Sequence, residues 1–336
     1  MCSMTTRVDL AVHGAATVRG AVPALFDGVR AQERSSSYFH LLDKSCDWAL
    51  PFETRGLPAA ALQHLAPESP TRIATAGDGV AAGDMAVQAA RAALAQAARD
   101  GDAEAAADSI RWLIYCHTTI DEITNGSIAC RLSHELQLKQ CFPVALSQSQ
   151  VAGTFIALLL AQSLLAEAAP GDRVMVVAAD KWLFPYLRSH GRWGVASDGA
   201  GALVLGGMDA PAATRITSVA VASAPEPMWT PIDALTPPQP QTGHAEGLAA
   251  QALQAGGLDS AAAPVLTAAA GEDDGEPPAL VALIERLRGV EAGAAGVIVL
   301  EGVHGDGGAC TVCTAPRNDR APATAARPAH PFLEIA

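Results

Sequence analysis

The sequence predicts an α/β fold in which strands and helices alternate and in which the same order of elements occurs twice. Most of the strand candidates are continuous apolar runs, which is typical of strands covered on both faces. Helical stretches separate these runs, and this alternation indicates sheets layered with helices. The segment "PVALSQSQVAGTFIALLLAQSLLAEAAPGDRVMVVAAD" (143–180) shows the pattern best: a strand, a sharp turn, an apolar helix and a second strand.

Further elements follow from the same patterns. Strands are predicted at 8–18, 110–119, 173–180, 201–207, 216–223, 264–270, 296–302 and 309–315. Helices are predicted at 83–100, 126–138, 151–167, 243–256 and 278–289. The strands at 110–119, 173–180 and 201–207 are matched by those at 264–270, 296–302 and 309–315, and each set ends in a Gly-containing turn and a closing strand.

This repeat has a period of more than about 100 residues, too long for a solenoid. The chain has 336 residues, roughly twice the ~150 that one domain typically uses. We therefore expect an N-terminal half at 1–210 and a shortened C-terminal half with a flexible tail at 211–336.

Composition excludes several classes of function. A net charge of −13 provides no basic surface for nucleic acid and disfavours an anionic membrane. The longest apolar run, around 151–166, falls short of the ~18 to 20 residues of a membrane span. The N-terminus lacks the basic and apolar segments of a signal peptide, so a cytoplasmic location is expected. Cys310 and Cys313 form a C-x-x-C without a second ligand pair, which predicts reduced thiols on a strand.

Several stretches resemble the thiolase superfamily, and within it the β-ketoacyl-ACP synthase III branch. "WGVASDGAGALVLGG" (193–207) is similar to the closing Gly-Asp-Gly-Ala-Gly-Ala turn of that family, and "FPVALSQSQVAGTFIALLLA" (142–161) to the strand, turn and central helix that carry its cysteine. "TAGDGVAAGDMAVQAARAALAQA" (75–97) resembles its first long helix, and "GVIVLEGVHGDGGACTVC" (296–313) its final hairpin. The resemblance implies a duplicated five-layer (αβαβα) fold.

Enzymes of this family need a thiolate at the start of the central helix, where the helix N-terminus lowers the pKa of the cysteine. A histidine and an asparagine from the second half then stabilise the developing oxyanion. The resemblance places the cysteine position on Val151, with Gln150 as the neighbour under a one-residue shift. The histidine position falls near 267–269 and holds none, and residues 271–295 contain no asparagine. The resemblance thus implies a degenerate member that lacks the Cys-His-Asn triad.

Other candidate residues are weaker. Ser149 precedes the cysteine position and could serve as a substitute nucleophile, or simply as a turn residue. His304 falls where the final hairpin of the family borders the active site, whereas His244 opens a helix and is expected at the surface.

Polar residues at the ends of first-half strands give further candidates. His117 and Asp121 follow a strand at the edge where α/β folds bind ligands, so they line a pocket, a subunit interface or neither. The residues Lys181, Arg192 and Trp193 contact a pantetheine chain or an acyl carrier, or else anchor loops. The glycine-rich 197–202 precedes a strand rather than a helix, which argues against a phosphate-binding loop.

The resulting hypothesis is a non-catalytic synthase-like subunit that pairs with a cysteine-bearing homologue in fatty-acyl or secondary-metabolite biosynthesis. The analogy is with the non-catalytic partners of alkylquinolone synthases and with chain-length factors. Two alternatives stay open: an acyltransferase or condensing enzyme that uses Ser149 or no nucleophile, and a protein that sequesters an acyl thioester. The resemblance also implies a dimer, hetero- or homomeric, formed through the strand at 110–119 as the edge of the first half. Acyl-CoA, acyl-ACP and an acyl carrier protein are the ligands and partners it implies, and no metal or other cofactor is expected.

Overall fold

The computed structural model describes most of the predicted elements. The described residues are 3–26, 71–77, 79–98, 102–119, 126–147, 150–182, 188, 195–207, 210, 212–222, 244–258, 264–267, 275–302 and 307–315. Five of the residues singled out above, Ser149, His304, Asp121, Arg192 and Trp193, lie outside these ranges.

Strands and helices alternate through these ranges. The strands are β1 (Ser3–Arg19), β2 (Val22–Phe26), β3 (Thr71–Thr75), β4 (Ile110–His117), β5 (Phe142–Ser147), β6 (Arg173–Asp180), β7 (Gly199–Gly206), β8 (Thr214–Ala222), β9 (Val265–Thr267), β10 (Ala295–Glu301) and β11 (Gly307–Thr314). The helices are α3 (Ala82–Ala97), α4 (Ala103–Asp108), α5 (Ile128–Glu135), α6 (Gln150–Ala166), α7 (His244–Gly256) and α8 (Ala279–Gly289). Strands β2 and β3 and the short α4 were not predicted from sequence.

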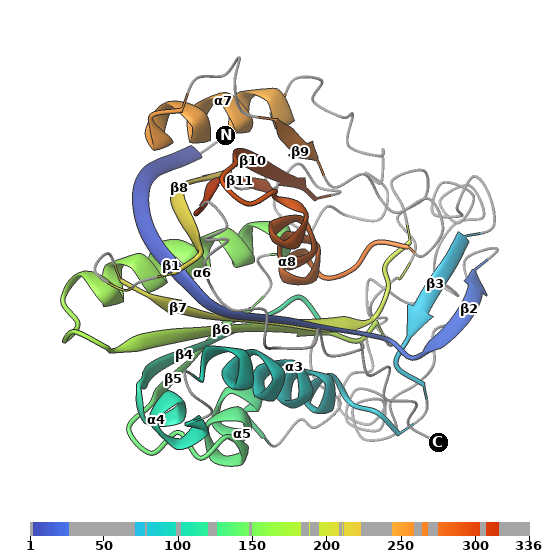
Figure 1. The fold of residues 1–336 in the computed structure, drawn as a ribbon. Helices are drawn as coiled ribbons and strands as arrows, with labels where there is room; N and C mark the ends of the chain where they lie inside the picture. Colours follow the sequence, from blue (N-terminus) through green and yellow to red (C-terminus); the bar gives the residue numbers. More distant parts are fainter. Residues whose placement is uncertain are drawn as a thin grey trace.

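One mixed sheet carries nine of the strands in the order β5-β4-β6-β7-β1-β8-β11-β10-β9. Strand β1 joins its two parts, because residues 11–19 pair with β7 while residues 3–12 pair with β8. The long, curved β1 therefore belongs to both halves of the sheet, as Figure 1 shows.

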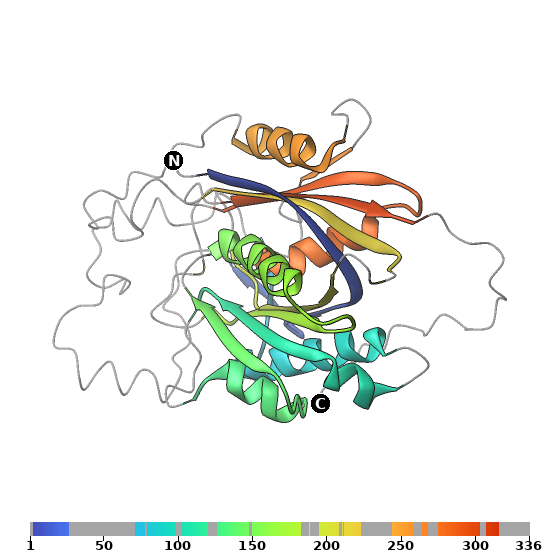
Figure 2. The same cartoon turned by 90° about the vertical axis from the view of Figure 1, so that its left-hand side faces the viewer.

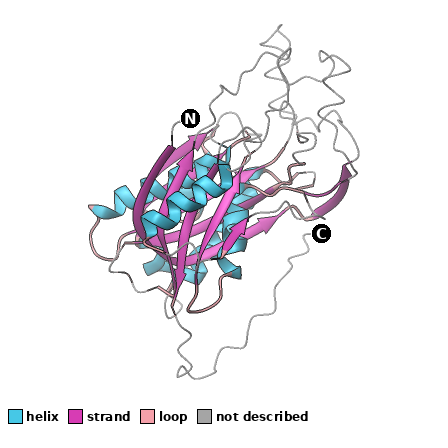
Figure 3. Cartoon of the chain, turned by 90° about the horizontal axis from the view of Figure 1, so that it is seen from above, coloured by secondary structure: helices cyan, strands magenta, loops and turns pink. Residues whose placement is uncertain are grey.

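Five layers result, and Figures 1 and 2 show them stacked. Helices α3, α4 and α5 cover the outer face of the β5-β4-β6-β7 part, and α7 covers the outer face of the β8-β11-β10 part. Helices α6 and α8 lie between the two parts and contact strands of both. The view from above in Figure 3 shows helices on the sheet and the strands running side by side. The layered α/β fold predicted from the sequence is confirmed.

The duplication is visible in the strand order. Strands β4, β6, β7 and β1 are neighbours in one part, and β9, β10, β11 and β8 are neighbours in the same sequence in the other. Helix α6 precedes β6 just as α8 precedes β10. Helices α6 and α8 are therefore corresponding elements of the two halves. Within the described residues, no strand of the second part corresponds to β5.

The predicted edge strand was wrong. The sequence placed 110–119 at the edge of the first half, but β4 lies between β5 and β6 and pairs with both in parallel. The edge is β5, whose residues pair with β4 in the register Trp112↔Phe142 to His117↔Ser147. Strand order follows from pairing between distant segments, which an apolar run does not reveal by itself.

Helix α6 is apolar on all sides because it has a sheet on either side of it. Phe155 in its second turn is fully buried and lies against β11, where a Cβ built on Gly308 would come within 2.1 Å of the Phe155 ring. Among the described residues, none of the helices combines the length and apolar character needed to cross a membrane.

Candidate functional site

A small cavity lies where the two central helices begin. Its volume is about 80 Å³, less than the roughly 300–1,000 Å³ of pockets that enclose drug-sized ligands. The described residues that line it are Cys116, His117, Thr118, Leu146, Gln150, Val151, Gly153, Thr154, Ala178, Asp180, Trp182, Ala196, Glu276, Pro277, Pro278, Ala279, Glu301 and Gly302. The site thus gathers the ends of β4, β6 and β10 and the first residues of α6 and α8.

The turn between β5 and α6 is strained at Gln150. Its φ of 41° lies in the left-handed region that non-glycine residues rarely adopt. Val151 follows in the first turn of α6, is half-buried and lines the cavity with Gln150. The resemblance expects the nucleophile at position 151, or at position 150 under a one-residue shift. An amide side chain and a branched hydrocarbon occupy these positions, and neither attacks a thioester.

A thiol does reach this cavity from β4. Cys116 is buried, and its Sγ donates to the Gly153 carbonyl in the first turn of α6, at 3.7 Å. Burial, together with the nearby Asp180 carboxylate, raises the pKa of this thiol to about 12. Cys116 is thus a neutral thiol at neutral pH, the opposite of the activated thiolate that acyl transfer requires. The sequence pattern does not reveal this thiol, because the resemblance places the cysteine on the helix and not on the strand beside it.

His117 lies next to Cys116 in sequence but belongs to the other face of β4. Successive strand residues point to opposite faces, and the imidazole stacks on Tyr115, two residues earlier, with ring centroids 5.2 Å apart. Its Nδ1 lies 2.9 Å from the Thr119 carbonyl oxygen. A carbonyl oxygen only accepts, so Nδ1 donates its hydrogen in this contact. The structure thus places His117 at the pocket that the sequence suggested.

Asp180 ends β6 and is a buried carboxyl group in the cavity wall. Its Oδ1 accepts hydrogen bonds from the Thr118 N–H at 2.7 Å, the Thr119 N–H at 2.8 Å and the Thr119 hydroxyl at 3.1 Å. Burial raises the pKa of Asp180 to about 6, although these bonds and His117 act in the opposite direction. The carboxyl group fastens the end of β4 to the end of β6 and still titrates close to neutral pH.

Glu276 is the second carboxyl group of the site and precedes helix α8. Its backbone is held on both sides, since its N–H donates to the Val195 carbonyl at 2.8 Å and its own carbonyl accepts from the Ser197 N–H at 2.7 Å. Burial raises the pKa of its side chain to about 7. The sequence analysis missed Glu276 because it looked for an asparagine in this segment. Its position just before a helix that corresponds to α6 is the signal that would have found it.

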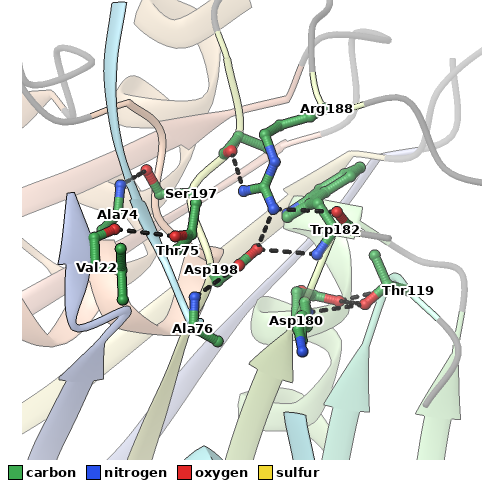
Figure 4. A network of polar contacts seen from close by, with 12 residues as sticks. Val22, Ala74, Thr75, Ala76, Thr119, Asp180, Trp182, Arg188, Ser197 and Asp198 are labelled. Atoms are coloured by element: carbon green, nitrogen blue, oxygen red, sulfur yellow. Dashed lines mark hydrogen bonds and ion pairs between the residues drawn. The ribbon is translucent and has the colours of Figure 1, made fainter. Parts of the chain in front are cut away.

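Asp198, in the glycine-rich turn 197–202, holds neighbouring chain segments together. Figure 4 shows its carboxylate accepting from the Ala76 N–H and the Trp182 N–H, both at 2.9 Å, and paired with the Arg188 guanidinium at 2.9 Å. All of Asp198 and nearly all of Arg188 is buried. The turn therefore ties three chain segments together and leads into β7, not into a helix.

Lys181 anchors a loop. Its ammonium group donates to the Val80 carbonyl at 2.8 Å and the Gly77 carbonyl at 3.4 Å, just before α3. Thr267, at the proposed histidine position, ends the short β9, and His244 begins α7 in the outer layer. Within the described ranges, no three His, Cys, Asp or Glu residues are grouped so that they could hold a metal ion.

Several solved structures share this architecture. The chain is 18% identical to ChlB3, described as an acyltransferase, with a TM-score of 0.63 over 92% of this chain and 98% of the other. A variant of OleA from Xanthomonas campestris is 16% identical, with a TM-score of 0.58 over 92% and 99%. 3-Oxoacyl-(acyl carrier protein) synthase III from Xanthomonas oryzae pv. oryzae is also 16% identical, with a TM-score of 0.58 over 92% and 100%.

The fold is thiolase-like, as the resemblance implied. No family model matches the sequence, and no curated protein matches it. At this level of identity the likeness concerns the fold alone.

The two buried carboxyl groups predict how stability depends on pH. Glu276 and Asp180 have folded-state pKa values of about 7 and about 6, above their ordinary values of 4.5 and 3.8. The folded protein therefore holds protons that the unfolded chain releases, and the free energy of unfolding falls as pH rises through this window. We expect Glu276→Gln to reduce this slope between pH 4.5 and 7 in chemical denaturation.

The matched control is Glu246→Gln, on the exposed side of α7. It should leave the slope unchanged. A slope identical in the protein with Glu276 and in the Glu276→Gln variant would show that this carboxyl group ionises normally in the folded state.

Proposed function

We propose that this protein is a non-catalytic synthase III-like subunit that assembles with a cysteine-bearing homologue in cytoplasmic fatty-acyl or secondary-metabolite biosynthesis. The observation that carries the proposal is the chemistry of the residues at the N-terminus of helix α6. Gln150 and Val151 stand at the turn, and the thiol that reaches the cavity, Cys116, has a pKa raised to about 12. A thiol with so high a pKa stays protonated at neutral pH.

The chemistry of condensation explains why a protonated thiol is unsuited to this reaction. An acyl group is transferred when a thiolate attacks the thioester carbonyl, and the oxyanion that forms needs hydrogen-bond donors aimed at it. The wall of this cavity also carries the acidic side chains Asp180, Glu276 and Glu301. Each of these groups repels a developing oxyanion when it is ionised.

Acylation of the chain tests this proposal. After incubation with acyl-CoA or acyl-ACP, we expect the intact mass of the isolated protein to remain unchanged, and thioester turnover to require the added homologue. The Ser149→Ala variant serves as the comparison for the hydroxyl nearest the turn. A covalent acyl adduct on the isolated chain that disappears in Ser149→Ala would assign catalysis to this protein and refute the proposal.

The edge strand β5 supplies the surface for assembly in this proposal. Among the described residues, β5 pairs with β4 on one side and with no strand on the other. Phe142 is 66% exposed, Ala145 and Ser147 are also exposed, and the other residues of β5 are partly buried. An open edge with apolar side chains is a template for pairing with another chain.

A positively charged side chain introduced on β5 should therefore abolish assembly. We expect Ala145→Lys, at an exposed position of β5, to convert the assembled protein to monomers in size-exclusion chromatography with light scattering, with no change in thermal midpoint of the monomer. Val265→Lys is the control, because Val265 is 50% exposed on β9 at the opposite edge of the sheet. If Ala145→Lys assembles as well as the unchanged protein does, pairing through β5 is wrong.

An enzymatic function is the second candidate, and the titratable groups of the cavity favour it. Burial raises the pKa of Glu276 to about 7 and that of Asp180 to about 6, and His117 lines the same cavity. Such groups can move a proton in an acyl transfer that forms no covalent intermediate. This candidate requires the isolated chain to release CoA from acyl-CoA, and Glu276→Gln to slow that release without changing the fold.

A further inference from the structure

The segment that follows strand β4 is held mainly by one side chain. The ladder that pairs β4 with β5 and β6 ends at His117, and Thr118 and Thr119 come after the last paired residue. The Asp180 carboxyl group accepts from both of their N–H groups, at 2.7 and 2.8 Å, and from the Thr119 hydroxyl at 3.1 Å. Figure 4 shows Asp180 and Thr119 facing each other. The position of Thr118 and Thr119 therefore depends on this carboxyl group.

The contact between Asp180 and the two threonines is shielded from solvent. Asp180 is 6% exposed and Thr119 3%. The three bonds all end on Oδ1, so a protonated carboxyl group keeps them while it carries its proton on the other oxygen. The ionised form gains the same bonds but loses its contact with water, and this burial raises the pKa of Asp180 to about 6.

The surroundings of Asp180 supply little positive charge. Four other titratable residues lie in the described part of the cavity wall: Cys116 and His117 from β4, Glu276 from the segment before α8, and Glu301 from the end of β10. His117 is the basic residue of this set and lowers the pKa of Asp180. The first residues of α6 bring no charge to the wall. The ammonium group of Lys181, the next residue along the chain, donates to backbone carbonyls before α3.

We propose that Thr118 and Thr119 form a pH-sensitive gate of the cavity, which Asp180 holds closed in its protonated form and releases after it loses its proton. In the open state water reaches the carboxylate, and its pKa returns toward the ordinary value of 3.8. The closed state thus binds the proton more tightly than the open state, so the gate is closed in acid and opens as pH rises through about 6. The values of about 6 and 3.8 allow a shift of at most about a hundredfold in the ratio of open to closed molecules.

Opening changes what reaches the start of helix α6. Thr118 lines the cavity together with Cys116 and Val151. The closed cavity has a volume of about 80 Å³, and release of Thr118 widens it on the side of β4. The gate does not depend on the function proposed above, because it requires only the contacts of Asp180.

Amide hydrogen exchange of the full chain, measured by NMR between pH 4.5 and 7.5 and corrected for intrinsic exchange rates, tests the gate. We expect the protection of the Thr118 and Thr119 N–H groups to fall about tenfold or more over this range. The Ala76 N–H is the internal reference, because it donates to the Asp198 carboxylate and not to Asp180. Its protection should fall less. An equal fall at Ala76 and at the two threonines would indicate loosening of the whole fold and would refute the gate, as would constant protection at the threonines.

Two variants separate Asp180 from the other carboxyl groups of the wall. Asp180→Asn retains an acceptor oxygen and does not ionise, so the protection of Thr118 and Thr119 relative to Ala76 should no longer change with pH. Glu276→Gln removes a carboxyl group from the same cavity and should leave that change in place. A dependence that persists in Asp180→Asn, or that disappears in Glu276→Gln, would assign the effect to another group and overturn the proposal. Should Asp180→Asn fail to fold, the comparison with Ala76 in the unchanged protein still decides.

Discussion

Asp198→Ala is expected to lower the free energy of unfolding by about 3–5 kcal/mol, because it leaves a buried guanidinium group without its partner. Arg188 is 8% exposed and pairs with the Asp198 carboxylate at 2.9 Å. The substitution also removes the acceptor of the Ala76 and Trp182 N–H groups. Two further buried donors then lack partners, which adds to the loss. We expect the turn at 197–202 to loosen, and β3 and the end of β6 to loosen with it.

Urea denaturation of the purified protein measures this loss. Asp198→Asn retains the shape and one acceptor oxygen and should lose less than Asp198→Ala, though more than a surface change. Glu104→Ala removes the exposed partner of Lys139 and should change the midpoint little. If Asp198→Ala is as stable as Glu104→Ala, the carboxylate does not hold these segments together.

Phe155→Ala is expected to lower the free energy of unfolding by about 3–5 kcal/mol, because it opens a cavity between the two halves of the sheet. Phe155 is fully buried in α6, the helix that contacts strands of both parts. The opposing change, Gly308→Ala, adds a methyl group that would lie 2.1–2.7 Å from three atoms of the Phe155 ring. Overpacking of this kind costs about 1–3 kcal/mol when the backbone gives way.

The pair forms a double-mutant cycle. In Phe155→Ala combined with Gly308→Ala, the added methyl group enters the space that the ring has vacated, so the double variant should be more stable than the sum of the single losses predicts. Gly247→Ala on α7 is the control, because a Cβ there meets no atom within 4 Å. It should stabilise the helix by about 0.5–1 kcal/mol. Additive losses in the cycle would show that Phe155 and Gly308 do not pack against each other.

Both substitutions act on the scaffold around helix α6. This helix contacts both parts of the sheet, and its first residues close one side of the cavity. Val151 at its start packs against the same core as Phe155. The five layers depend on this helix and on the Asp198 network for their packing.

The apolar runs by themselves determined the α/β class, the positions of most strands and the two central helices. A strand covered on both faces needs a continuous run of Val, Leu, Ile and Ala, and a helix between two sheets must be apolar on every side. Burial on both faces can therefore be predicted from the sequence. The absence of a cysteine at Gln150 and Val151 was likewise visible in the sequence.

Only the tertiary structure decided that β5 and not β4 is the edge, and which side chains meet at the cavity. Cys116, Asp180 and Glu276 come from segments as far apart as 160 residues (276 minus 116). Their proximity, and the burial that raises their pKa values, arises from packing between elements that local patterns do not encode.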